Sequence, residues 1–175
     1  MKKILLLIIS LYLCPCIYAQ KIQYETKDKG IYLYNTVSHL LYNKNNQINS
    51  WNTTSGINTY EKITSIYPLL REIFSQKLIE ELASQKAILI IGTSINSTGE
   101  IKEVFFILDS ITEKCLNENN NFINDLNTLE NLLINKRIKL MSKLTEQDYY
   151  KIYGGIRFNL LSDWISNQSN ENPLE

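Results

Sequence analysis

Two apolar runs joined by a short polar turn constrain the fold of this chain more than any other feature. The first run covers residues 87–91, the second is Ile101–Leu108, and the polar segment 96–99 between them ends in a glycine. Glycine can adopt the positive φ that tight hairpin turns require. Away from the turn, both faces of the second run are apolar. The pattern predicts a hairpin whose base is buried on both faces and whose tip reaches solvent.

Apolar residues at helical spacing predict one amphipathic helix on each side of this hairpin. Within residues 60–85 the apolar positions are Leu70, Ile73, Phe74, Leu78 and Leu82. Pro68 suits the first turn of that helix, where its missing N–H is not needed. The second helix carries Phe122, Leu126, Leu129 and Leu133, and the polar residues 117–121 before it offer N-caps.

Both ends of the mature chain have strand patterns. Near the C-terminus, Ile156, Phe158 and Leu160 alternate with polar residues and predict a half-buried strand, with a turn or bulge at residues 154–155. The residues after Trp164 are polar, and a frayed tail is expected at 165–175.

Near the N-terminus, residues 22–24 and 31–34 flank a turn at 28–30 and predict a second hairpin. Residues 37–42 could equally begin a helix, and 43–58 form a polar loop around Trp51. The chain is therefore expected to be a single α+β domain over 20–164. It has an N-terminal hairpin and loop (20–58) and a helix-hairpin-helix-strand core (60–161), in which an antiparallel sheet with a central hairpin packs against two helices.

The first nineteen residues read as a secretory signal peptide. Lys2 and Lys3 precede an apolar stretch at 4–13, and Ala19 offers a signal-peptidase site. An uncleaved anchor is the first alternative, although the stretch is shorter than the about 20 residues that span a bilayer. Lipidation at Cys14 or Cys16 is the second. A cleaved signal peptide would make this an exported protein, periplasmic or at the cell surface, with no transmembrane span after cleavage.

Composition of the mature chain excludes some classes of function. Removing Lys2 and Lys3 from 18 basic residues leaves 16 against 18 acidic residues, a net charge of about −2. Such a chain lacks the basic surface of nucleic-acid-binding proteins. Only Cys115 remains after cleavage, so no internal disulfide can form.

No residue qualifies from the sequence as a catalytic, cofactor-binding or metal-binding residue. His39 is the only histidine and has no nucleophile motif near it, so a surface or partly packed side chain is expected. Cys115 lies in a polar stretch, where Lys114 beside it is only weak support for the lowered pKa of a reactive thiol. An incidental cysteine, or at most an intermolecular contact, is expected. A hydrolase would need at least two of four candidate carboxylates to lie together in one cleft. These four are Glu80, Glu100, Glu103 and Asp109.

The order helix, hairpin, helix, strand resembles the C-terminal domain of TonB-like proteins. The matching residues are Tyr67 and Pro68, the hairpin at 88–108 with its turn at 97–101, and the closing strand at 155–160. The spacing from Pro68 to the first strand is longer than is usual in that family. The uncleaved anchor and Pro-rich linker of its energy-transducing members are also missing. The resemblance implies a small binding domain of the cell envelope, and an uncharacterised α+β envelope family is the alternative.

Two functions follow from these patterns. The first is a noncatalytic envelope module that binds another protein or a peptide, for which unpaired sheet edges are suited. The second is a secreted hydrolase that uses the carboxylates named above.

Overall fold

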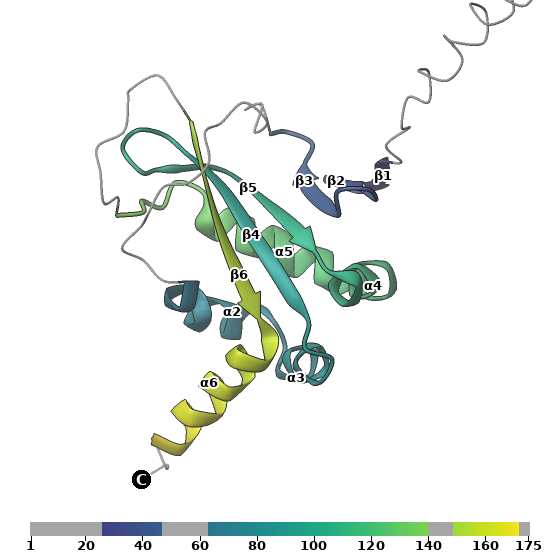
Figure 1. Ribbon diagram of the computed structural model, residues 1–175, viewed down its shortest axis with the longest axis vertical. Helices are drawn as coiled ribbons and strands as arrows, with labels where there is room; N and C mark the ends of the chain where they lie inside the picture. The colour runs from purple at the N-terminus through teal and green to yellow at the C-terminus, as the bar shows by residue number, and fades with distance from the viewer. Residues whose placement is uncertain (1–25, 47–62, 140–148, 172–175) are drawn as a thin grey trace, which may run out of the picture.

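The computed structural model describes residues 26–46, 63–139 and 149–171 (Figure 1). Three predicted features lie outside the described residues: the signal peptide expected at 1–19, the strand expected around Ile22 and Tyr24, and Trp51 with most of its loop. Within the described residues, no helix combines the length and apolar character needed to cross a lipid bilayer.

Six antiparallel strands form one open sheet in the order β1-β2-β3-β5-β4-β6. Two neighbouring interior strands are the predicted hairpin, β4 (Ile88–Ile95) and β5 (Ile101–Leu108), with Gly99 at φ +80° in its turn. The α+β prediction with a central hairpin is therefore confirmed. The predicted number of helices is too low, because the described part of the chain has five α-helices where two were expected.

The N-terminal strands extend the sheet from β5. They are β1 (Thr26–Lys29), β2 (Tyr32–Asn35) and β3 (Leu40–Asn43). Gly30, at φ +74°, turns β1 into β2, and its N–H donates to Asp28 Oδ1. The alternative that residues 37–42 begin a helix is wrong, because β3 pairs with β5 at Leu41 and Phe106.

The first predicted helix is broken into two. A 3₁₀ turn η2 (Ile63–Ile66) leads into α2 (Tyr67–Ile73), and α3 (Gln76–Ser84) follows. The break occurs because Phe74 is extended and the Ser75 side chain caps α3 by accepting from the Leu78 N–H. Pro68 occupies the first turn of α2 as predicted.

A helix that the sequence analysis did not predict follows β5. It is α4 (Ser110–Glu118), and the Asp109 carboxylate caps it by accepting from the N–H groups of Ile111 and Thr112. The predicted second helix is α5 (Asn120–Leu133), capped by Asn119 from within the expected polar segment. This helix packs behind the central hairpin (Figure 1).

The C-terminal prediction needs two corrections. The strand β6 (Tyr150–Arg157) ends before Phe158, and α6 (Phe158–Glu171) replaces both the end of the strand and much of the expected frayed tail. Phe158, Leu161 and Ile165 are all buried, and their spacing of three and four residues is helical. The expected bulge is also absent, because β6 pairs with β4 in continuous register through Gly154 and Gly155.

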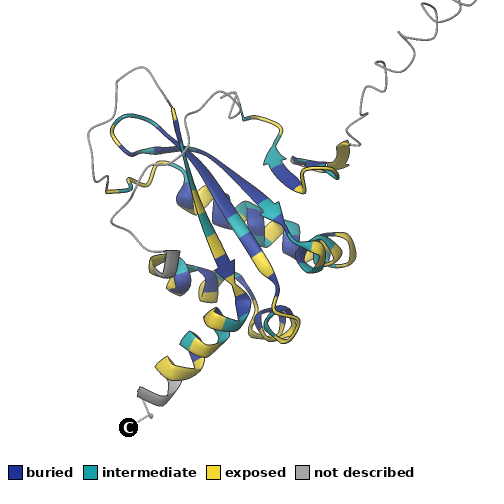
Figure 2. Cartoon of the chain, viewed as in Figure 1, coloured by how far each residue is buried: buried dark blue, intermediate teal, exposed yellow. Residues whose placement is uncertain are grey.

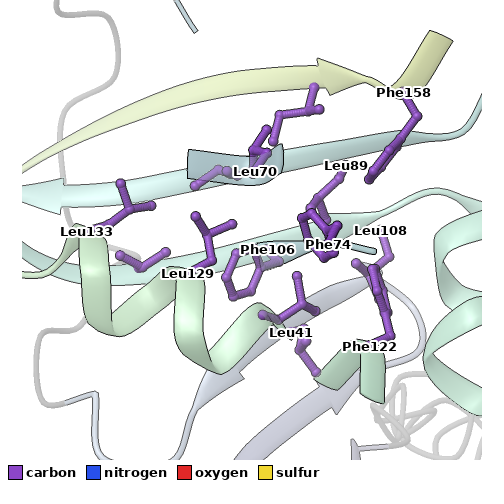
Figure 3. Close-up of a cluster of buried hydrophobic side chains, with 14 of the residues drawn as sticks. Leu41, Leu70, Phe74, Leu89, Phe106, Leu108, Phe122, Leu129, Leu133 and Phe158 are labelled. Atoms are coloured by element: carbon purple, nitrogen blue, oxygen red, sulfur yellow. The ribbon is translucent and has the colours of Figure 1, made fainter. Parts of the chain in front are cut away.

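The core lies between one face of the sheet and the helices, and most of β4 and β5 is buried (Figure 2). Figure 3 shows Phe106 and Leu89 from the hairpin meeting Phe74, Phe122 and Phe158 from the helical layer. The ring centroid of Phe74 lies 5.9 Å from that of Phe122 and 6.0 Å from that of Phe158. The helical layer thus covers one face of β4, β5 and β6, and leaves a second face whose residues have different neighbours.

Candidate functional site: the outer face and edge of the sheet

The outer face is the side of β4, β5 and β6 opposite the helical core. Cross-strand partners share a face, so the register assigns its residues. Along three strands they are Ile88, Ile90, Gly92 and Ser94; Glu103, Phe105 and Ile107; and Lys151, Tyr153, Gly155 and Arg157. None of the described helices packs across this face in Figure 1.

A missing side chain at Gly92 lets an aromatic ring lie flat against the outer face. An alanine methyl group at Gly92 would sit 2.1 Å from Phe105 Cε2 and Cζ, so the ring occupies the space above the glycine. Tyr153 meets that ring edge-on, with centroids 5.6 Å apart and an interplanar angle of 77°. The result is an aromatic pair that is buried at Phe105 and 51% exposed at Tyr153.

A second glycine leaves a gap beside this pair. Nothing lies within 4 Å of a methyl group built at Gly155, and the residue is exposed. Tyr153 and Arg157 flank it on the same face of β6, and Ile90 lies opposite it on β4. We call this position the Gly155 gap. Arg157 is exposed and forms no ion pair with any described carboxylate.

Charge on the outer face differs between its two ends. At one end Lys151, Ser94 and Glu103 lie in register on three neighbouring strands. Burial lowers the pKa of Lys151, and the negative charge of Glu103 works in the opposite direction. Lys151 is therefore compensated by a carboxylate, and Lys151 Nζ also lies 5.9 Å from the centre of the Phe105 ring. At the Arg157 end the nearby carboxylate is Asp109, which accepts from the N–H of Ile88, the partner of Arg157 on β4. Asp109 also caps α4 and forms no ion pair with Arg157.

The two edges of the sheet are protected to different degrees. Edge strand β1 has four residues with the sequence TKDK, three of them charged. Short, charged edge strands resist pairing with other chains. Edge strand β6 has eight residues with the sequence YKIYGGIR, its centre is uncharged, and it has no bulge. No described strand pairs with the outer side of β6, so its backbone groups form an edge suited to strand addition.

The four carboxylates expected for a hydrolase do not come together. Glu100 pairs with Lys102 (2.8 Å) beside the hairpin turn, and this ion pair lowers the pKa of Glu100. Asp109 caps α4 beyond the other end of β5, about 30 Å away at the rise of an extended strand. Glu80 lies on α3 and accepts from Gln76, and Glu103 lies on the outer face. This geometry gives no acid/base pair from that set.

His39 has more neighbours than its sequence context indicated. Its side chain is about half exposed, and Nδ1 lies 3.2 Å from both the Tyr34 hydroxyl and Glu113 Oε2. Its backbone has a positive φ of 54°. Burial, together with hydrogen bonding to Glu113, raises the pKa of Tyr34. The cluster ties the β2–β3 turn to α4, and no nucleophile in the described chain joins it.

Cys115 lies on α4 and packs against the core. Burial is the main cause that raises the pKa of its thiol to about 11, with Glu81, Asp125 and Glu118 adding to the effect. Such a thiol is mostly protonated at neutral pH, which makes it a poor nucleophile.

A buried polar cluster around Glu130 was not predicted from the sequence. Glu130 on α5 is 1% exposed and accepts hydrogen bonds from the Tyr32 hydroxyl and from Asn43 Nδ2. Burial raises the pKa of Glu130, and its two hydrogen-bond partners act against that rise. The available signal was its position four residues after Leu126, on the apolar face of the helix.

Comparison with known proteins identifies a fold. A scan against protein-family models finds no match, and a search of curated proteins finds none. A solved structure that matches is the crystal structure of a DUF5043 family protein from Bacteroides uniformis ATCC 8492, with a TM-score of 0.52 and 19% sequence identity. The match covers 78% of this chain and 92% of that chain.

The likeness is one of fold. It fits the expectation of an uncharacterised family. The TonB-like resemblance stays a prediction, and the last residues of the strand that carried it, 158–160, are helical.

Proposed function

We propose that this protein is an exported, noncatalytic envelope module that binds an extended peptide by adding it as a strand along β6. The contrast between the two sheet edges carries the proposal, because β6 is long, continuous and uncharged at its centre while β1 is short and charged. Backbone hydrogen bonds from an added strand provide affinity, and side chains on alternate residues provide selectivity. Export rests on the signal-peptide pattern of residues 1–19.

A periodic loss of binding tests strand addition directly. Linear decapeptides displayed as a random library are selected on the immobilised protein, and a bound peptide is resynthesised with one N-methyl group at each backbone position in turn. Only alternate residues of an antiparallel partner exchange hydrogen bonds with β6. We therefore expect every second N-methyl group to abolish binding and the others to have little effect. Loss at all positions, or at a helical spacing, would contradict strand addition.

Matched lysine substitutions locate the binding edge. Tyr153→Lys places a charge at the centre of β6, and Thr26→Lys places one on exposed β1. A central charge discourages pairing at an edge. We expect Tyr153→Lys to weaken peptide binding at least tenfold and Thr26→Lys to leave it unchanged, as measured by fluorescence anisotropy with a labelled peptide. Equal effects of the two variants would remove β6 as the site.

A further inference from the structure

The outer-face residues of β6 also indicate the chemistry of the bound peptide. We propose that the peptide added along β6 carries an aromatic residue opposite Gly155 and an Asp or Glu opposite Arg157. In an antiparallel peptide these two positions form the motif acid-x-aromatic. This inference rests on the proposed strand addition and concerns which peptides the site selects.

The Gly155 gap selects for the aromatic residue. Directly opposite residues on one face of a sheet have Cβ atoms about 4.5–5.5 Å apart, so a large side chain there can lean over the glycine. Aromatic side chains opposite an edge glycine cover its exposed backbone in this way. The ring would also lie beside Tyr153, which is half exposed and already meets Phe105 edge-on.

Arg157 selects for the acidic residue. It is exposed, lies two positions from Gly155 on the same face, and forms no ion pair with a described carboxylate. A carboxylate opposite it can accept two parallel hydrogen bonds from the guanidinium group. The carboxylate of Asp109 lies near this end of the sheet, but it accepts from the N–H of Ile88 and caps α4. It forms no ion pair with Arg157, so the guanidinium group is available to a carboxylate of the peptide.

Charge also argues against a second copy of this chain as the occupant. Antiparallel self-pairing of β6 about Gly154 would place Tyr153 opposite Gly155, which is favourable. The same pairing would place Lys151 of each copy opposite Arg157 of the other. Like charges directly opposite one another destabilise a strand pair. A peptide with an acid at that position avoids the repulsion and gains an ion pair.

Three capped nonapeptides of threonine and serine test the motif. The first has Asp at position 4 and Tyr at position 6, the second has Lys in place of Asp, and the third has Ala in place of Tyr. We expect the second and third to bind the purified protein about tenfold more weakly than the first, measured by anisotropy at low salt. Arg157→Glu should reverse the preference between the Asp and Lys peptides. Gly155→Val, which fills the gap, should weaken the first peptide to the level of the third.

The outcomes separate this inference from strand addition itself. Equal binding of the Asp and Lys peptides, unchanged by Arg157→Glu, would overturn the motif even where the N-methyl pattern still shows strand addition. Failure of every library peptide to bind would overturn the proposed function instead. A dimer in analytical ultracentrifugation that Tyr153→Lys dissociates would show that a second copy occupies β6. Unchanged thermal unfolding of Gly155→Val is the control that its loss of binding is local.

Discussion

Replacing Gly92 with alanine forces a methyl group into the space that the Phe105 ring occupies. The new carbon would lie 2.1 Å from two ring carbons and 2.8 Å from a third, far inside contact distance. The ring cannot easily move aside, because Phe105 is 5% exposed and Tyr153 flanks it. Overpacking a site of this kind costs about 1–3 kcal/mol. Alanine in a strand regains about 0.5–1 kcal/mol relative to glycine. We expect Gly92→Ala to lower the free energy of unfolding by about 1–2 kcal/mol.

Gly155→Ala is the matched control, because the same change on the neighbouring strand meets no atom within 4 Å. It should leave the free energy of unfolding unchanged or raise it by up to about 1 kcal/mol. Urea denaturation followed by circular dichroism compares the two variants. A Gly92→Ala protein that is as stable as Gly155→Ala would refute the packing of Phe105 over Gly92.

A double-mutant cycle isolates the contact. In a Phe105→Ala background the ring is gone, so adding Gly92→Ala should cost nothing. The coupling energy between the two sites should then be about 1–3 kcal/mol, within the range for residues in direct contact. A cost of Gly92→Ala that is the same in both backgrounds would show that strand geometry, and not the ring, requires the glycine.

Three further predictions concern other parts of the chain. Burial raises the pKa of Glu130 above its usual 4.5, so the folded state binds this proton more tightly than the unfolded chain does. Protonated Glu130 therefore adds to the free energy of unfolding at low pH, and this contribution is lost as pH rises from about 4.5 through the folded-state pKa. Glu130→Gln, which can still accept from Tyr32, should flatten that part of the urea-midpoint profile, and an unchanged profile would contradict the assignment. Cys115 has a thiol pKa of about 11 and should react with iodoacetamide at neutral pH much more slowly in the folded protein than in the protein unfolded by denaturant. Equal rates in the two states would show an accessible thiolate. Protein isolated from its native host should begin at Gln20, whereas a lipid-modified Cys14 or Cys16 at the N-terminus would support the lipoprotein alternative.

The sequence by itself determined the elements whose signals are local. The central hairpin was readable because two apolar runs flank a glycine turn, and α5 because four large residues repeat at helical spacing behind a capping asparagine. The same local signals misled at Phe158, where alternation over three residues matched a strand. The helical spacing of Phe158, Leu161 and Ile165 decided the structure instead, because a helix buries all three against the core.

Only the tertiary structure decided which face each strand residue uses and which strand lies at the edge. Phe105 and Phe106 are adjacent and equally apolar, yet one packs over Gly92 on the outer face and the other enters the core. Likewise, the sequence of β6 does not predict that this strand lies at an edge of the described sheet. Strand order depends on which segments meet in space. The proposed site follows from that order. Its two glycines and its arginine are ordinary in the sequence and become distinctive only where the sheet ends.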